Sequence, residues 1–178
     1  MREFKFRGRA FNTNKWIYGN SIKHTDNPTN GCDIEELIYI GNKVPNARKV
    51  GAMKWIPVDP STIGQFTGLL DKDGKEIYES DIIDACFKYE TLDANGCVNP
   101  DKDCLCKGVV RFSKERLQWV LDIFWAESPI AQWMKEEEDT EIPLVHFEYE
   151  SPKYNMSLLE VIGNVYDNSD LIQQHNEL

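Results

Sequence analysis

The stretch VDPSTIGQFTGLLDKDGKEIYESDII, residues 58–83, decides the fold that we expect for this chain. Its residues 65–70 and 76–78 flank the turn sequence DKDGK at 71–75, in which Asp-Gly supplies the positive φ of a tight hairpin. Residues 59–62 read as a preceding turn, and residues 81–89 (DIIDACFKY) read as a following strand. Gly64 and Gly68 are typical of a close backbone approach or of a kinked strand at a barrel corner. The stretch therefore predicts consecutive β-strands.

The same pattern continues on both sides of this stretch. Short alternating or β-branched runs separated by Asn, Asp, Gly and Pro predict strands at 4–7, 16–18, 34–40, 54–58, 108–112, 117–125, 144–149 and 158–165. Pro57 restricts its strand to a sheet edge, and Gly163 predicts a bulge in the last strand. Within 144–149, Val145 and Phe147 should share one face and His146 the other. We expect a β-rich fold with minor α: a twisted, partly closed, barrel-like sheet of short antiparallel strands.

Helices and loops fill the remaining stretches. Ser128-Pro129 predicts the start of one short helix, and Asn168-Ser169-Asp170 caps a second one at 171–175. Residues 24–33 (HTDNPTNGCD) read as a loop, and residues 88–107 break every period, so an inserted loop or flap is expected there. No composition shift or repeat marks a boundary, and 178 residues suit one domain. The sequence thus predicts a single domain over residues 1–178 with an insertion at about 88–107.

Charge and hydrophobicity exclude several classes of protein. The chain has 20 Lys and Arg against 30 Asp and Glu, a formal net charge of −10, which repels phosphate, so no nucleic-acid partner is expected. The one basic cluster, Arg2, Lys5, Arg7 and Arg9, alternates with apolar residues, so a strand would place part of it on a solvated face. No run of 18 apolar residues and no secretory leader is found, so we expect no membrane partner.

The five cysteines favour a reducing compartment, because their number is odd and no leader precedes them. We therefore expect a cytoplasmic protein. Three of them, Cys97, Cys104 and Cys106, fall in the expected loop, and Cys86 lies upstream. Their spacing contains no Cys-x2–4-Cys pair, so free thiols are expected rather than zinc. A disulfide within the loop stays open, since spacing alone does not establish one.

Catalytic chemistry finds little support in the motifs. The chain has neither the G-x-S-x-G elbow nor the glycine-rich phosphate loops. Glu79 and Asp81 could act as a carboxylate pair, with His146 as a further donor, but turn acids of this kind are usually solvated. We assign no catalytic, cofactor-binding or metal-binding residue and expect no cofactor.

Three blocks of sequence resemble the YopX family of phage and prophage proteins. They are FKFRGRAFNTNKWIYGN at 4–20, the stretch at 58–83, and LEVIGNVYDNSDLI at 159–172. The resemblance implies a β-rich protein of a phage or integrated element that tends to self-associate, and it carries over no catalytic residue. Similar sequences read Glu-Gly-Asp where this chain reads Glu79-Ser80-Asp81, which predicts a turn that does not need positive φ.

The favoured interpretation is therefore a non-enzymatic accessory protein whose partner is a second copy of itself, with a host or phage protein as a further candidate. The five Trp, at 16, 55, 119, 125 and 133, support it because aromatic residues left outside a core anchor interfaces. Two alternatives stay open. One is a metal-assisted hydrolase that uses Glu79, Asp81 or His146. The other is an acidic nucleic-acid mimic that blocks a host DNA-binding protein.

Overall fold

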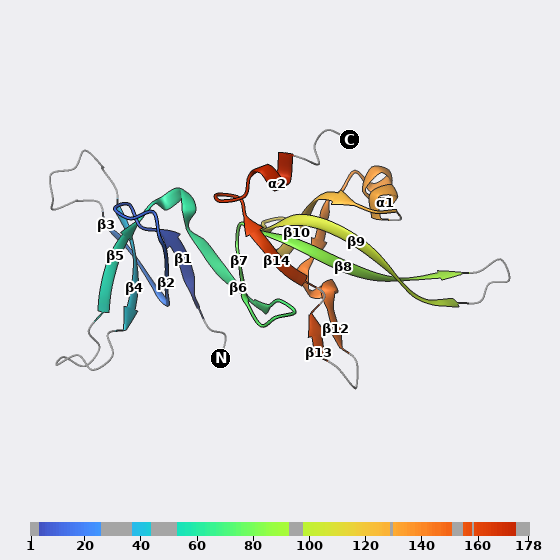
Figure 1. Ribbon diagram of the computed structural model, residues 1–178, viewed down its shortest axis with the longest axis horizontal. Helices are drawn as coiled ribbons and strands as arrows, with labels where there is room; N and C mark the ends of the chain where they lie inside the picture. The colour runs from blue at the N-terminus through green and yellow to red at the C-terminus, as the bar shows by residue number, and fades with distance from the viewer. Residues whose placement is uncertain are drawn as a thin grey trace. The chain divides into compact units, whose positions relative to one another are not determined.

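The computed structural model describes residues 4–25, 37–43, 53–92, 98–128, 130–150, 155–157 and 159–173 (Figure 1). The chain is mostly β, with short helices, and includes a curled half-barrel antiparallel sheet. The expected β-rich fold with minor α is therefore confirmed. The chain divides into two compact units, Met1–Gly68 (unit 1) and Leu69–Leu178 (unit 2). Such units can belong to one domain, so the single domain expected over residues 1–178 stays a prediction.

Unit 1 is built from two small antiparallel sheets. One contains β2 (Trp16–Gly19), β1 (Phe6–Arg9) and the beginning of β6 (Gly64–Leu70), and the other contains β3 (Ser21–Thr25), β4 (Leu37–Lys43) and β5 (Met53–Val58). The 3-10 helix η1 (Pro60–Thr62) precedes β6 and is capped by Asp59, whose Oδ1 accepts from Ser61 N at 2.9 Å. Pro57 lies on β5, which is an edge strand as expected. Residues 26–36 lie outside the described part of the chain, and β3 covers the beginning of the expected loop at 24–33.

The two sheets of unit 1 approach each other closely at a glycine residue. Gly19 ends β2 against β4, and a Cβ there would meet the carbonyl oxygen of Gly41 at 2.5 Å and Cγ2 of Ile40 at 2.6 Å. Only glycine allows this approach of two backbones. Ile40 and Val58 are buried in a small core with Ala10, and a Cβ on Gly8 of the facing sheet would meet both of them within 3.2 Å.

Residues 64–78 form the hairpin that the sequence predicts. Strands β6 and β7 (Glu76–Tyr78) are joined by the turn at 71–75, in which Asp71 N donates to Lys75 O at 2.8 Å. Gly74 has φ +80°, which is the left-handed conformation that the Asp-Gly pair predicts. Gly68, with φ +95°, provides the kink expected in β6.

Unit 2 is centred on a five-stranded antiparallel sheet. Its order is β11-β10-β9-β8-β14, with β11 at Glu141–Pro143, β10 at Gln118–Ala126, β9 at Val98–Ser113, β8 at Asp81–Leu92 and β14 at Leu159–Asn164. Strand β14 shifts register against β8 between Val161 and Gly163, so the predicted bulge is confirmed. Helix α1 (Ile130–Glu137) packs Ile130 against the sheet, and α2 (Asp170–Gln173) follows β14.

The apolar cluster of unit 2 lies on one face of this sheet. Its buried members are Ile77, Ile83, Ala85, Cys104, Cys106, Val110, Leu121, Ile123, Ile130, Ile142, Leu144, Phe147 and Leu159. They come from most elements of the unit, so the strand order is the one that brings these side chains together. Their burial stabilises the unit by about 25 cal/mol for each Å² of apolar surface removed from water.

The prediction of a loop at 88–107 is wrong for the residues that the structure describes. Strands β8 and β9 continue through residues 88–92 and 98–107 and pair with each other as one long hairpin, with a bulge between Tyr89 and Thr91. Among the described residues, β14 pairs with β8 only up to Ala85, and β10 pairs with β9 only from Cys106. The rest is a two-stranded ribbon, drawn extending past its neighbours in Figure 1. A ribbon open on both edges tolerates Pro100 and alternating charges, which is why its composition resembles that of a loop.

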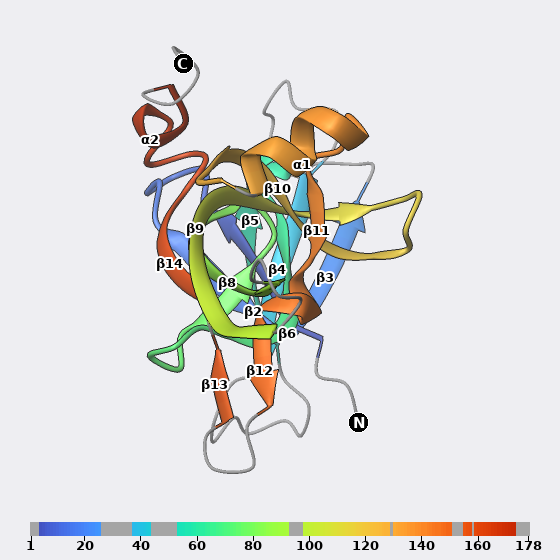
Figure 2. The same ribbon diagram turned by 90° about the vertical axis from the view of Figure 1, so that its right-hand side faces the viewer.

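The strand expected at 144–149 is wrong for its first part. Residues Leu144–Phe147 form the 3-10 helix η2, and β12 (Glu148–Glu150) begins only afterwards. Strand β12 pairs with β13 (Asn155–Ser157) as a separate hairpin that extends from the rest of unit 2 in Figures 1 and 2. In a 3-10 helix residues three apart lie on one side, so Leu144 and Phe147 are both buried while Val145 is 57% exposed.

Candidate functional site

The Glu79-Ser80-Asp81 segment forms a buried turn between β7 and β8. Asp81 is 1% exposed, and its Oδ2 accepts from Tyr78 N at 2.8 Å. Ser80 has φ +68°, its N donates to Val110 O at 2.8 Å, and its O accepts from Val165 N at 3.0 Å. The prediction that this turn does not need positive φ is therefore wrong, because these two backbone hydrogen bonds hold Ser80 in the left-handed conformation. The Asp81 carboxylate closes the turn, while Glu79 is partly buried beside it.

Asp71 is a structural carboxylate that the sequence shows only as a turn residue. Its Oδ1 accepts from Asp73 N at 2.9 Å and from Lys75 N at 2.8 Å, which is how an Asp at the start of a turn usually bonds. Its Oδ2 accepts from Val161 N, at 3.3 Å, on β14. Lys72 N also donates to Leu159 O at 2.9 Å. Asp71 thus joins the hairpin to the bulged strand.

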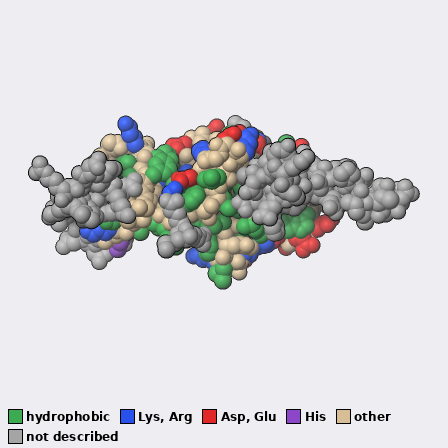
Figure 3. All heavy atoms as spheres, turned by 90° about the horizontal axis from the view of Figure 1, so that it is seen from below, with side chains coloured by type: hydrophobic (Ala, Val, Ile, Leu, Met, Phe, Trp, Pro, Cys, Tyr) green, Lys and Arg blue, Asp and Glu red, His purple; other side chains and the backbone are tan. Residues whose placement is uncertain are grey.

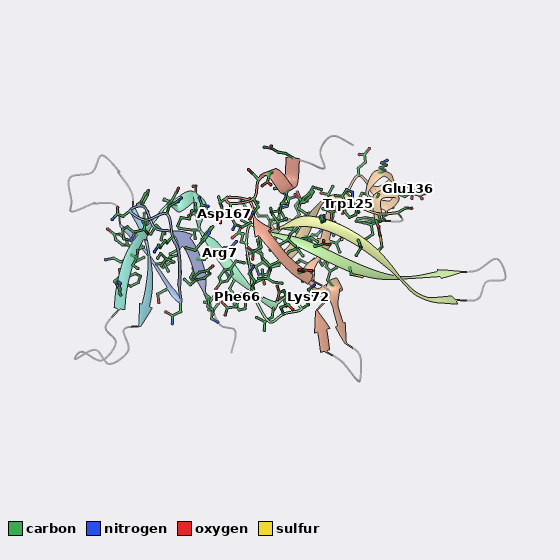
Figure 4. The ribbon with its side chains drawn as sticks, viewed as in Figure 1. Arg7, Phe66, Lys72, Trp125, Glu136 and Asp167 are labelled. Carbon is green, nitrogen blue, oxygen red and sulfur yellow. The ribbon has the colours of Figure 1, made fainter. Side chains whose placement is uncertain are left out.

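Lys72 and Glu160 add a surface ion pair at the same place. Lys72 Nζ lies 2.5 Å from Glu160 Oε2, and both side chains are about half exposed (Figure 4). The hydrogen bond to Glu160 raises the pKa of Lys72. Exposed ion pairs of this kind contribute little to stability, so this pair helps to orient the turn but adds little to the free energy of unfolding.

We call one set of contacts the β14 seam. It comprises the contacts that four residues make with β14, with the loop that follows β14, or directly beside them: Asp71, Lys72, Ser80 and Asp81. Gly163 completes the seam, because a Cβ at this position would meet Asn168 Oδ1 at 2.4 Å. Asn168 Oδ1 accepts from Asn164 N at 3.2 Å. The seam is a scaffold built from polar atoms, and its carboxylates are held by backbone N–H groups.

Two of the three thiols left open by the sequence lie in the apolar cluster. Cys104 and Cys106 are fully buried on the same side of β9, and Cys104 Sγ lies 3.3 Å from Glu127 O as a donor. Burial raises the pKa of Cys106 to about 12 and also raises that of Cys104. Since the thiolate is the reactive form, both residues act as small apolar side chains at neutral pH. Cys97 lies outside the described residues.

The carboxylates and His146 that the hydrolase alternative needs are not shown to converge. His146 has its backbone in η2, and its side chain lies outside the described part of the structure. Within that part, His, Cys, Asp and Glu form no group of three placed to hold a metal ion. The described helices also include none that is long and apolar enough to cross a membrane.

The formal charge of −10 is divided unequally between the two units. Unit 1 contains 10 Lys and Arg against 6 Asp and Glu, a net charge of +4, whereas unit 2 contains 10 against 24, a net charge of −14. Figure 3 shows red Asp and Glu side chains in several places on unit 2, with blue Lys and Arg side chains among them. The composition of the whole chain conceals this division.

Some cations of unit 2 are already paired within the unit. Arg111 Nη2 lies 2.9 Å from Glu141 Oε1 and 3.3 Å from Asp122 Oδ2, and Arg116 contacts both Asp139 and Glu141. By contrast, α1 ends in the exposed run Glu136–Glu138, with Glu136 labelled in Figure 4. Acids at the C-terminal end of a helix are unfavourable for the helix dipole, so this run serves the surface rather than the helix.

The basic cluster at the N-terminus is stacked on aromatic rings of its own unit. The Arg7 and Arg9 guanidinium carbons lie 4.9 and 5.3 Å from the centre of the Trp16 ring, and Lys5 Nζ lies 5.3 Å from that of Phe66. Arg7 is buried, and Figure 4 shows Arg7 and Phe66 on unit 1. In cation–π contacts of this kind, the positive charges interact with aromatic rings of the same unit. This cluster is therefore not a simple solvated basic face.

The outer face of the β3-β4-β5 sheet carries a different set of side chains. Lys23 on β3 lies opposite Tyr39 on β4, and Trp55 on β5 lies opposite Gly41, the next position of β4 on the same face. Trp55 is 37% exposed, Lys23 is exposed and Tyr39 is partly buried. The opposite face presents Ile40 to the core. Trp55 was an aromatic candidate from its residue type, but Lys23 was not predicted because no strand was expected at residues 21–25.

Comparison with known proteins agrees with this description of the chain. Residues 5–173 match the sequence model of the family described as YopX protein. No curated protein matches the sequence.

Proposed function

Because this match covers nearly the whole chain, the chain belongs to the YopX family, and we propose that it is an accessory protein of a phage or prophage that works by self-association rather than by catalysis. It acts in the cytoplasm of the bacterial host, which the free thiols of Cys86, Cys104 and Cys106 support. The observation that carries the proposal is the division of charge into +4 on unit 1 and −14 on unit 2.

Opposite charges on two units of one chain favour contacts between copies. Unit 1 of one molecule attracts unit 2 of another at short range, even though two whole molecules of −10 repel each other at long range. The contact joins two different surfaces, so it is heterologous and produces rings or open chains. Exposed aromatic side chains, such as Tyr18 and Trp55 on unit 1 and Trp133 on unit 2, supply apolar anchors.

Sedimentation velocity of the full chain tests the proposal. We expect the sedimentation coefficient to rise between about 5 and 300 μM protein, the range in which contacts of micromolar affinity form. The rise should be larger at about 50 mM NaCl than at about 500 mM, because salt screens the attraction. A monomer over the whole range at low salt would contradict the proposal.

The acidic-mimic alternative is favoured by one observation, the charge of −14 on unit 2. A concentrated negative field of this kind competes with nucleic acid for basic proteins. It would show itself as 1:1 complexes with a host DNA-binding protein that displace DNA. The hydrolase alternative is weaker, because the Asp81 carboxylate is buried and bonded to Tyr78 N.

A further inference from the structure

The outer face of the β3-β4-β5 sheet combines exposed aromatic and cationic side chains. No Asp or Glu occurs in these three strands, and Lys23 is the cation that the described side chains place on this face, since Lys54 lies opposite Asn42 and shares the face of Ile40. Within the described part of the chain, no side-chain hydrogen bond, ion pair or ring contact engages Lys23, Tyr39 or Trp55. Aromatic rings on the exposed face of a sheet contribute little to the fold and are typical of an interface.

Charge complementarity selects the occupant of this face. Lys23 attracts an acidic surface, and the chain itself supplies one in unit 2, whose net charge is −14. A nucleic acid would also match Lys23, and binding of an oligo-dT strand distinguishes it from a second copy.

We propose that the outer face of the β3-β4-β5 sheet, formed by Lys23, Tyr39 and Trp55, docks on the acidic unit 2 of a second copy of this chain. The inference rests on the proposed self-association and names the surface that performs it. Trp55 and Tyr39 provide the desolvated centre of the contact, and Lys23 provides its charge. Charge at the edge of such a contact acts mainly on the rate of association and on its salt dependence.

Charge reversal and truncation on the full chain test the inference. Lys23→Glu is compared with Lys15→Glu, an exposed turn residue of the same unit that undergoes the same change of charge. Trp55→Ala is compared with Phe11→Ala, another exposed aromatic residue of unit 1. Sedimentation equilibrium at about 50 mM NaCl should show association weakened about tenfold or more in Lys23→Glu and Trp55→Ala, and less than about threefold in the two controls.

The outcomes separate the inference from the proposed function. A wild-type chain that stays monomeric contradicts self-association itself. A wild-type chain that associates, with Lys23→Glu equal to Lys15→Glu and Trp55→Ala equal to Phe11→Ala, overturns only the docking face. Binding of a labelled oligo-dT strand by the wild type, lost in Lys23→Glu and kept in Lys15→Glu, would assign the face to nucleic acid and also overturn it. Circular dichroism confirms that Trp55→Ala is folded, and Lys23→Glu decides the result if it is not.

Discussion

The apolar cluster and the β14 seam of unit 2 hold the same strands together by different means. The cluster buries side chains such as Leu121, Phe147 and Leu159 on one face of the sheet. The seam uses polar atoms, with Asp71 and Asp81 accepting backbone hydrogen bonds and Ser80 held in a left-handed conformation. The cluster requires apolar volume, whereas the seam requires particular atoms at particular positions.

The difference explains where the sequence is most distinctive. The blocks at 58–83 and 159–172, which carry the family resemblance, are the ones that meet at the seam. A cluster accepts other apolar residues of similar volume, but a carboxylate that joins a turn to β14 has no simple replacement. The specific blocks of this chain therefore have a structural explanation in the contacts of the seam.

The largest expected effect comes from breaking the cluster at Phe147. Phe147→Ala removes a fully buried ring from the 3-10 helix η2 and leaves a cavity, so it should lower the free energy of unfolding by about 3–5 kcal/mol. Urea denaturation followed by circular dichroism measures the change.

Val145→Ala is the control, because Val145 lies two residues earlier and is 57% exposed. It should change the free energy of unfolding by less than about 0.5 kcal/mol. If both variants were strongly destabilised, residues 144–147 would form a strand that buries alternate side chains, and the description of η2 would be wrong.

Breaking the seam at Asp71 should have the next largest effect. Asp71→Ala removes the acceptor of three backbone hydrogen bonds, from Asp73 N, Lys75 N and Val161 N, in a buried position. We expect a loss of about 3 kcal/mol in the free energy of unfolding, since charged acceptors are the strong ones and the freed N–H groups lose their partners.

Asp73→Ala in the same turn provides the comparison for Asp71→Ala. Asp73 is exposed and has the same charge, so its removal should change stability by less than about 0.5 kcal/mol. Equal effects of the two substitutions would show that charge, rather than the hydrogen bonds to the turn and β14, accounts for the role of Asp71.

Local patterns predicted the parts of the fold whose structure depends on neighbouring residues. The turn at 71–75, the edge position of Pro57 and the bulge at Gly163 each follow from backbone chemistry that the residue type reveals. The prediction of a loop at residues 88–107 was wrong because a ribbon with open edges has the composition of a loop. The prediction of a strand at residues 144–147 was wrong because the alternating pattern of the run concealed the spacing of three between Leu144 and Phe147.

The seam and the candidate interface depend on contacts between distant parts of the chain, so they could not be predicted in this way. Asp71 and Val161 are 90 residues apart, and only the structure brings them together. The +4 and −14 charges of the two units likewise require a boundary that no composition shift marks. Trp55 was already a candidate from its residue type, but its face needs the register of β3, β4 and β5.

The smallest expected effect sharpens the description of the seam at Ser80. A left-handed conformation costs about 1–2 kcal/mol in a residue with a Cβ, and Ser80 has φ +68°. Ser80→Gly removes that strain and keeps the backbone hydrogen bonds to Val110 and Val165. Glycine also loses more backbone freedom on folding, by about 0.5–1 kcal/mol, so the net stabilisation should be about 0.5 kcal/mol.

Ser80→Ala separates the two contributions, because alanine keeps the Cβ and removes only the hydroxyl. It should leave the free energy of unfolding within about 0.5 kcal/mol of the wild type and below that of Ser80→Gly. Thermal unfolding of the three chains, followed by calorimetry, gives the order. If Ser80→Gly were the least stable of the three, the hydroxyl and Cβ would support the turn, and the left-handed conformation of Ser80 would not be a source of strain.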